Sequence, residues 1–182
     1  MNKGRLIIIS GPSGAGKGTV LAELFKAIPD LKYSVSATTR APRPGEKHGV
    51  QYFFITKEQF EEKIKAGEML EYASYCDNYY GTPVDYVEEQ RNLGFDVILE
   101  IEPCGALQVM GKCKDALSIF ILPPSLEELE RRLSGRGTES DEVVAERIAQ
   151  AKNELMQKEQ YQHTVVNDDV KRAVEEIKKI IK

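Results

Sequence analysis

A glycine-rich stretch near the start of the chain combines the residue types that bind phosphate. Residues 11–19 read Gly-Pro-Ser-Gly-Ala-Gly-Lys-Gly-Thr, a form of the pattern G-x-x-x-x-G-K-x-T. The apolar run from Leu6 to Ile9 precedes the stretch, and apolar residues at helical spacing follow it, which is the strand, turn and helix context of a phosphate-binding loop. Backbone N–H groups in such a turn can converge on one anion at the positive end of the helix, and Lys17 adds a positive charge. The stretch therefore predicts a phosphate-binding loop.

The hydroxyl residue of this motif lies one position later than usual. Ser or Thr commonly follows the lysine directly, whereas here Gly18 intervenes and the hydroxyl belongs to Thr19. This spacing resembles that of nucleoside monophosphate kinases. It leaves open whether Thr19 binds a magnesium ion directly or through water.

The arginines of this acidic chain are unevenly distributed. Six of the nine fall in two clusters, namely Arg40 and Arg43 in a proline-rich loop, and Arg131, Arg132, Arg136 and Arg147 further along. A guanidinium matches the oxygens of a phosphate and stays charged at any working pH, so the clusters predict anion binding. One of Arg131 and Arg132 could instead make only surface pairs along a helix, with Glu127 and Glu128. Arg136 lies between glycines, in a turn with no helical partner, which favours a functional role.

Two acids mark the end of a predicted strand over residues 95–101. Glu100 and Glu102 are two positions apart, so they share one face of the strand. Ligands of open α/β sheets bind at the carboxyl ends of parallel strands. The pair could orient magnesium-bound water or bind a substrate, or it could simply turn into solvent at the end of the strand.

The composition fits one α/β domain. The chain has 182 residues, 41% hydrophobic and 30% charged, and its net charge of −4 argues against a general nucleic-acid binder. No apolar stretch reaches membrane-spanning length, and we expect no signal peptide. Three cysteines without metal-ligand spacing fit a reducing environment, so we expect a cytoplasmic protein. His48 and His163 are too far apart to suggest a metal site or a catalytic triad.

Strands and helices are predicted to alternate along most of the chain. Strands are expected over residues 6–9, 33–37, 51–54, 95–101, 117–122 and 164–166, with strand and turn pieces at 69–75 and 79–81. Helices are expected over residues 20–26, 57–67, 83–94, 105–112, 126–135, 141–160 and 170–181. Thr56 and Gln59 form a capping-box signature at the start of the second helix, and Thr82 and Ser125 are expected to cap the third and the fifth. The alternation predicts a parallel sheet covered on both faces, which residues 34–84 interrupt as an insertion.

Five segments together resemble the guanylate kinase family over nearly the whole chain. They are Gly11–Lys17, Ser36–Glu46, Asn78–Thr82, Arg132–Glu139 and Val166–Asp168. The resemblance implies a three-layer α/β/α fold of the P-loop NTPase class, with a parallel core sheet, a mixed α+β insertion that binds GMP, and a helical lid. Within a single guanylate-kinase-like domain, the core would be residues 1–33, 85–124 and 161–182, the GMP-binding region 34–84, and the lid 125–160.

The resemblance also implies a reaction and its residues. The γ-phosphate of ATP would pass to GMP, and by extension to dGMP, giving ADP and GDP in purine nucleotide metabolism. Catalytic roles fall on Lys17, Arg132, Arg136 and Arg147. ATP would bind to Gly11, Pro12, Ser13, Gly14, Ala15, Gly16, Lys17, Gly18, Thr19, Arg136 and Asn167. GMP would bind to Ser36, Arg40, Arg43, Tyr52, Glu71, Tyr80, Thr82, Glu100 and Glu102. Mg²⁺ would accompany ATP, with no tightly bound organic cofactor.

Some alternatives stay open at this point. Tyr52 and Tyr80 could be core aromatics, although their neighbours Phe53, Phe54 and Tyr79 include the better candidates for packing. A non-catalytic binding module, or a kinase for another nucleoside monophosphate, could share these motifs, but the intact lysine and lid arginines argue against the module. The absence of an N-K-x-D motif argues against a GTPase switch. We expect no nucleic-acid or membrane partner, a monomer or weak homo-oligomer, and closure of the insertion and lid during the reaction.

One segment departs from the family pattern. The sequence reads Pro103-Cys104-Gly105 where the family usually has an apolar residue and Gln before the glycine. Any role of that Gln is absent here. The path of the chain after Glu102 is therefore open.

Overall fold

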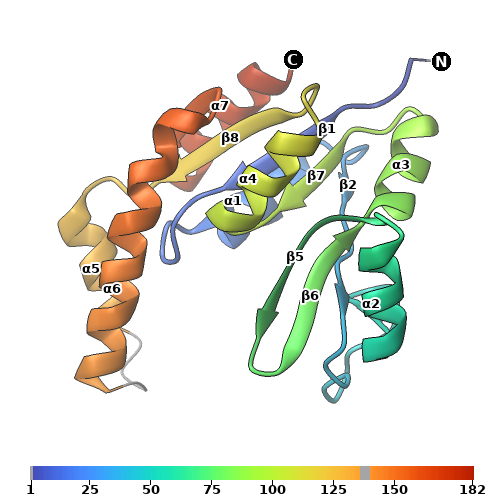
Figure 1. Ribbon diagram of the computed structural model, residues 1–182. Coiled ribbons are helices and arrows are strands. Elements are labelled where there is room, and N and C mark those ends of the chain that lie inside the picture. The colour runs from blue at the N-terminus through green and yellow to red at the C-terminus, as the bar shows by residue number, and fades with distance from the viewer. Residues whose placement is uncertain (1, 136–139) are drawn as a thin grey trace. The chain divides into compact units, whose positions relative to one another are not determined.

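The computed structural model describes residues 2–135 and 140–182 (Figure 1). The strands are β1 (Leu6–Ser10), β2 (Lys32–Tyr33), β3 (Ala37–Thr38), β4 (Phe53–Phe54), β5 (Met69–Tyr75), β6 (Asn78–Pro83), β7 (Val97–Glu100), β8 (Leu117–Leu122) and β9 (His163–Val166). The helices are α1 (Lys17–Ala27), α2 (Lys57–Lys65), α3 (Val84–Asn92), α4 (Pro103–Lys112), α5 (Leu126–Ser134), α6 (Asp141–Leu155) and α7 (Val170–Ile181), with a short 3₁₀ helix, η1 (Met156–Gln160).

The strands form two sheets of different character. The core sheet has the order β2-β7-β1-β8-β9, and its pairs β1–β8, β8–β9 and β2–β7 are all parallel. The second sheet has the order β4-β3-β6-β5 and is mixed, because β3 runs parallel to β4 whereas β6 is antiparallel to both β3 and β5. The parallel core and the mixed α+β insertion that the sequence predicts are both confirmed.

The chain divides into two compact units. The first comprises residues up to Leu6, Lys32–Leu99 and Cys104–Ala116, and the second comprises Ile7–Leu31, Glu100–Pro103 and Leu117–Lys182. The predicted GMP-binding region belongs to the first unit, and the described part of the predicted lid belongs to the second.

The mixed sheet β4-β3-β6-β5, which belongs to the first unit, packs one of its faces against an apolar cluster. Ala37, Phe60 and Met69 form a buried cluster, against which Phe53 and Tyr79 also pack. Phe60 comes from α2, and its ring stacks on that of Tyr79 with centroids 5.0 Å apart. Because side chains alternate along a strand, the next residue of each strand points to the opposite face of the sheet. That opposite face is free to carry polar groups.

The second unit packs helices against buried strands. Every residue of β1 is buried, as are three apolar residues of α1, namely Val20, Leu21 and Leu24. Helices α1 and α7 contact each other, and α7 buries Ala173, Val174, Ile177 and Ile181. Helices α5 and α6 lie side by side (Figure 1) and share a cluster of Leu129, Leu133 and Ala151. This packing holds both helices beside the glycine-rich loop, as described below.

Several predicted element boundaries are wrong for identifiable reasons. The strand expected over residues 33–37 is two short strands in different sheets, because Ser34 N still donates to Ile98 O while Ser36 O already accepts from Phe53 N. The helix expected to run from 141 to 160 ends at Leu155, and the next turns tighten into η1. Helix α4 begins at Pro103, because proline is tolerated at a first helical position, where its missing N–H is not needed. The chain therefore continues from Glu102 directly into a helix.

Helix caps are partly as predicted. The capping box of Thr56 and Gln59 at the start of α2 is present, and Ser125 accepts a hydrogen bond from Glu128 N at the start of α5. Thr82, however, does not cap α3. The N-cap is Pro83, with no side-chain cap, and the Thr82 hydroxyl donates to Glu71 instead. Among the described residues, none of the helices is long and apolar enough to cross a membrane.

Candidate active site

The glycine-rich loop of the second unit needs glycine for two separate reasons. Gly16 has a φ of 83°, in the left-handed region that favours glycine, and it is the residue from which α1 begins. A Cβ there would also lie 2.5 Å from Asn167 Nδ2. At Gly11 a Cβ would lie 2.4 Å from the backbone oxygen of Ile121. The loop can therefore follow this path only with glycine at both positions.

Lys17 is folded back across its own loop. It is the first residue of α1 and is 9% exposed. Its Nζ donates to Gly11 O at 2.6 Å and to Pro12 O at 3.3 Å, and it lies 3.9 Å from Glu102 Oε1. The ammonium group thus donates to two carbonyl oxygens of the loop, and a phosphate oxygen could take their place as the acceptor. The lysine is thus positioned for an anion bound in the loop.

A pocket of about 680 Å³ opens over this loop within the second unit. Its lining combines loop backbone, cations, acids and an amide. The residues are Ser13, Gly14, Gly16, Lys17, Gly18, Thr19, Glu100, Glu102, Arg132, Leu133, Asn167, Asp168 and Val170. The structure therefore brings together the predicted loop, both acids at the end of β7, one predicted catalytic arginine and Asn167.

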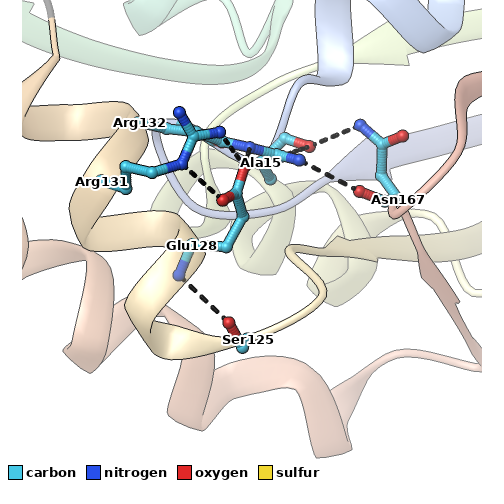
Figure 2. A network of polar contacts seen from close by, with 7 residues as sticks. Ala15, Ser125, Glu128, Arg131, Arg132 and Asn167 are labelled. Carbon is cyan, nitrogen blue, oxygen red and sulfur yellow. Dashed lines mark hydrogen bonds and ion pairs between the residues drawn. The ribbon is translucent and has the colours of Figure 1, made fainter.

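Arg132 and Asn167 bind to the loop from two directions (Figure 2). Asn167 Nδ2 donates to Ala15 O at 2.8 Å, and Asn167 is 4% exposed. Arg132 Nη1 donates to the backbone oxygens of Gly14 and Ala15 at 3.4 and 3.5 Å, and its Nη2 donates to the backbone oxygen of Asn167 at 3.4 Å. Both side chains thus approach the backbone that would surround the phosphates.

Glu128 forms ion pairs with two neighbouring arginines, which differ in their other contacts. It pairs with Arg131 at 2.7 Å and with Arg132 at 2.8 Å, and hydrogen bonds from both hold its pKa at about 2. Arg131 is a largely exposed partner on the helix surface, whereas Arg132 also reaches the loop. The surface pairing that the sequence allowed for one of the two applies to Arg131 (Figure 2).

Helix α6 contacts the loop through two side chains. Arg147 donates from Nη2 to Ser13 Oγ at 3.3 Å, and Ser13 N donates to Glu154 Oε2 at 3.4 Å. Glu154 is 8% exposed and also accepts from Gln150 Nε2. Sequence reasoning missed Glu154, although its position seven residues after Arg147 places both on one face of the helix. Arg136 lies outside the described residues.

Glu102 of this pocket lies among charges of both signs. Displacement of water by surrounding protein raises the pKa of Glu102, and the charges of Glu154 and Glu100 raise it further, whereas Lys17 lowers it. The positive charge of Lys17 therefore favours the ionised form of Glu102. Within the described residues, no three His, Cys, Asp or Glu side chains gather so as to hold a metal ion by themselves.

A second polar cluster lies on the first unit, around Arg40. Its guanidinium makes a bidentate ion pair with Glu46, with both N–O distances at 3.0 Å. This hydrogen-bonded pair raises the pKa of Arg40, to which Tyr80 also contributes. The guanidinium carbon lies 5.6 Å from the ring centroid of Tyr52, which meets the ring of Tyr80 edge to face. Tyr52 and Tyr80 are therefore not members of the buried cluster beside α2.

Two other residues of the predicted GMP set, Ser36 and Arg43, lie close to Arg40 in the sequence. Arg43 is exposed, and its backbone N–H donates to Glu46 Oε2 at 2.7 Å. Ser36 is half-buried, just before β3, and its carbonyl accepts from Phe53 N. Glu46 thus orders the proline-rich loop by binding both the Arg40 side chain and the Arg43 backbone.

Glu71 is a buried carboxylate in the same sheet. It is 8% exposed, and it is the register partner of Thr82 on the neighbouring strand. The Thr82 hydroxyl donates to Glu71 Oε1 at 2.7 Å. Burial raises the pKa of Glu71, while this hydrogen bond and the charge of Lys112 lower it. Thr82, Glu71 and the Arg40 cluster belong to the first unit, whereas Glu100 and Glu102 belong to the second.

The chain is similar to known proteins in both sequence and structure. The family described as guanylate kinase matches residues 3–182. A guanylate kinase of Streptococcus pyogenes serotype M3 is 58% identical over 181 residues, covering 98% of this chain and 85% of that protein. The crystal structure of guanylate kinase from Anaplasma phagocytophilum is 34% identical, with a TM-score of 0.75 over 99% of this chain and 85% of that chain. Shikimate kinase from Bacteroides thetaiotaomicron, 18% identical, shares the fold alone, with a TM-score of 0.53 over 97% of this chain and 98% of that chain. This chain belongs to the guanylate kinase family.

Proposed function

We propose that the two polar sites divide the substrates of one reaction between them. The chain is a guanylate kinase, which phosphorylates GMP at the expense of ATP. ATP is assigned to the loop pocket of the second unit, and GMP to the polar face of the sheet in the first. A non-catalytic binding module is not favoured, because the loop, its lysine and Arg132 are all in place around one pocket.

The buried carboxylate of Glu71 is the observation that supports guanine as the acceptor base. Guanine presents an N1–H and an exocyclic amine side by side, and both can donate to one carboxylate. Adenine presents an acceptor at N1, which a carboxylate repels. A site built on such hydrogen bonds rejects the wrong base by roughly 10⁴-fold or more. Thr82 holds Glu71 in place from the neighbouring strand.

The Arg40 cluster suits the phosphate of GMP. Its ion pair with Glu46 fixes the plane of the guanidinium, and the Tyr52 and Tyr80 rings lie beside it. Arg43 is exposed on the same loop and adds a second positive charge. Both arginines match phosphate oxygens in charge and geometry. Because these contacts address the base and the phosphate, we expect dGMP to be accepted as well.

The loop pocket suits the phosphates of ATP. Lys17, Arg132 and Arg147 lie on or against the loop, and Asn167 fixes the path of its backbone. The charge that develops on the transferring phosphate would be stabilised by these cations, and by Arg136 in the proposed lid. Glu100 and Glu102, assigned from the sequence to GMP, line this pocket.

The donor set of the pocket fits a magnesium ion that arrives with ATP. Mg²⁺ is usually bound by one or two protein oxygens together with phosphates and water. Thr19, Glu100 and Glu102 line the pocket and offer such oxygens. When bound, Mg²⁺ supplies charge neutralisation of the outer phosphates. A contact of Thr19 with the ion, direct or through water, stays a prediction.

The reaction needs no general base from the protein. A phosphate monoester has a second pKa of about 6, so the acceptor oxygen of GMP is already ionised near neutral pH. The chain then contributes positioning and charge stabilisation. Closure of the proposed lid, residues 125–160, would exclude water and so prevent wasteful hydrolysis of ATP.

Turnover with different acceptors tests this function. Release of ADP from ATP is measured with GMP, dGMP, IMP, AMP and UMP in turn, for the wild type and for Glu71→Gln. We expect strong preference for GMP and dGMP in the wild type, and loss of that preference in Glu71→Gln. Comparable turnover of AMP by the wild type would contradict the assignment, and no ADP above background with GMP would indicate a binding module.

A further inference from the structure

Gly105 lies in direct contact with the carboxylate that is proposed to recognise guanine. It is the third residue of α4 and is buried. A Cβ at this position would lie 2.9 Å from Glu71 Oε2, 3.4 Å from its Cδ and 3.5 Å from its Cγ. These are the three nearest atoms, and all belong to the Glu71 side chain. The space that a side chain would need here is therefore occupied by Glu71.

Glu71 is held from two sides. The Thr82 hydroxyl donates to Oε1 at 2.7 Å, and Oε2 lies against the bare Cα of Gly105. Because Glu71 is 8% exposed, its carboxylate has little room for another position. A methyl group on residue 105 would push Oε2 away by several tenths of an ångström to reach ordinary van der Waals contact. The displacement would tilt the carboxylate about its bond to Thr82.

The backbone of α4 does not itself require glycine at this position. Gly105 is not among the glycines with positive φ, and glycine is a poor helix former. Gly111 lies in the same helix, and a Cβ there would meet nothing within 4 Å. The two glycines differ in what surrounds them, and only Gly105 borders a side chain of the proposed GMP site. The structural reason for glycine at position 105 is therefore the space that the Glu71 side chain occupies.

We infer that Gly105 is a positioning residue for acceptor specificity, whose missing side chain lets the Glu71 carboxylate accept from both donors of guanine. The inference rests on the proposed role of Glu71. A displaced carboxylate keeps its charge and burial but loses alignment with one of the two donors. GMP then loses its advantage over IMP, whose base has the N1–H but lacks the exocyclic amine.

The test compares Gly105→Ala with the matched control Gly111→Ala from the same helix. The kcat/KM values for GMP and IMP, the KM for ATP and the melting temperature are measured for each. Gly105→Ala should lower the GMP-to-IMP ratio of kcat/KM roughly tenfold or more, as expected for one impaired hydrogen bond to a charged group. The KM for ATP should not change. The melting temperature should change little, because the helix propensity gained with alanine offsets the cost of displacing Glu71. Gly111→Ala should leave the ratio unchanged.

Two further variants distinguish the role of Gly105 from the proposed role of Glu71. Adding Gly105→Ala to Glu71→Gln should cause no further loss of the GMP-to-IMP ratio, since a residue that acts through Glu71 has nothing left to position. If Glu71→Gln keeps the wild-type ratio, the role of Glu71 is wrong. If Glu71→Gln loses the ratio but Gly105→Ala keeps it, only the inference about Gly105 is wrong. Failure of Gly105→Ala to fold would also overturn it, because the inference requires the methyl group to be admitted by movement of Glu71.

Discussion

Replacement of Thr82 by valine removes the hydroxyl that donates to the Glu71 carboxylate while keeping the shape of the side chain. Thr82 is fully buried, so water cannot replace the lost donor. Leaving a buried acceptor without its partner costs about 1–3 kcal/mol. In a chain of 182 residues, 1 kcal/mol lowers the melting temperature by about 2–4 °C. We therefore expect a decrease of about 2–12 °C near neutral pH.

The size of this decrease should depend on pH. Burial raises the pKa of Glu71 above its ordinary value of 4.5, so the folded protein binds this proton more tightly than the unfolded chain. The contribution of this carboxyl to stability therefore rises as the pH falls through its folded pKa towards 4.5. Thr82 favours the charged form, so its loss matters most when Glu71 is charged. The deficit of Thr82→Val should be largest near neutral pH and shrink on acidification.

Thermal unfolding of wild type and variant at about pH 7.5 and about pH 5 measures this difference. Thr38→Val is the matched control, because Thr38 is equally buried in the neighbouring strand β3 but its hydroxyl donates to the neutral backbone oxygen of Tyr79 at 2.9 Å. The deficit of the control should not depend on pH. A Thr82→Val deficit that is absent, or equal at the two pH values, would refute the reasoning about Glu71.

Other substitutions test the remaining parts of the site. Lys17→Met should lower kcat by roughly 10²–10³-fold, as for loss of one transition-state donor, with an unchanged circular dichroism spectrum. The control Lys26→Met, on the exposed surface of the same helix, should be fully active. Equal activity of the two variants would contradict the role of Lys17. Arg43→Ala should raise the KM for GMP but not for ATP, with the exposed Lys57→Ala as control; an unchanged KM for GMP would remove Arg43 from the acceptor site. Chelation of divalent ions should abolish ADP release and added Mg²⁺ should restore it, whereas activity that survives chelation would contradict a magnesium-dependent transfer.

The sequence predicts those features that depend on local spacing. The loop at residues 11–19, the capping box before α2 and the Ser125 cap each follow from a few neighbouring residues, and the structure contains all three. The parallel core sheet follows from the alternation of strands and helices. Local patterns therefore sufficed for the parallel core sheet and for the strand, turn and helix around the glycine-rich loop.

Features that depend on distant partners could not be predicted in this way. Thr82 has the residue type of a helix cap, but its hydroxyl binds Glu71 on the neighbouring strand, which the local sequence does not show. Glu154 lies in a strongly charged helix and looks like a solvated acid until α6 is placed against Ser13. The close approach of Gly105 to Glu71 likewise joins residues far apart in the chain. Tertiary contacts decided each of these cases.

A crystal structure of the protein with GMP bound tests the assignment of substrates most directly. The account predicts the guanine N1–H and exocyclic amine within hydrogen-bonding distance of Glu71, and the phosphate on Arg40 and Arg43. The loop pocket around Lys17 should stay available for ATP. GMP bound in the loop pocket, or with its base away from Glu71, would contradict the account.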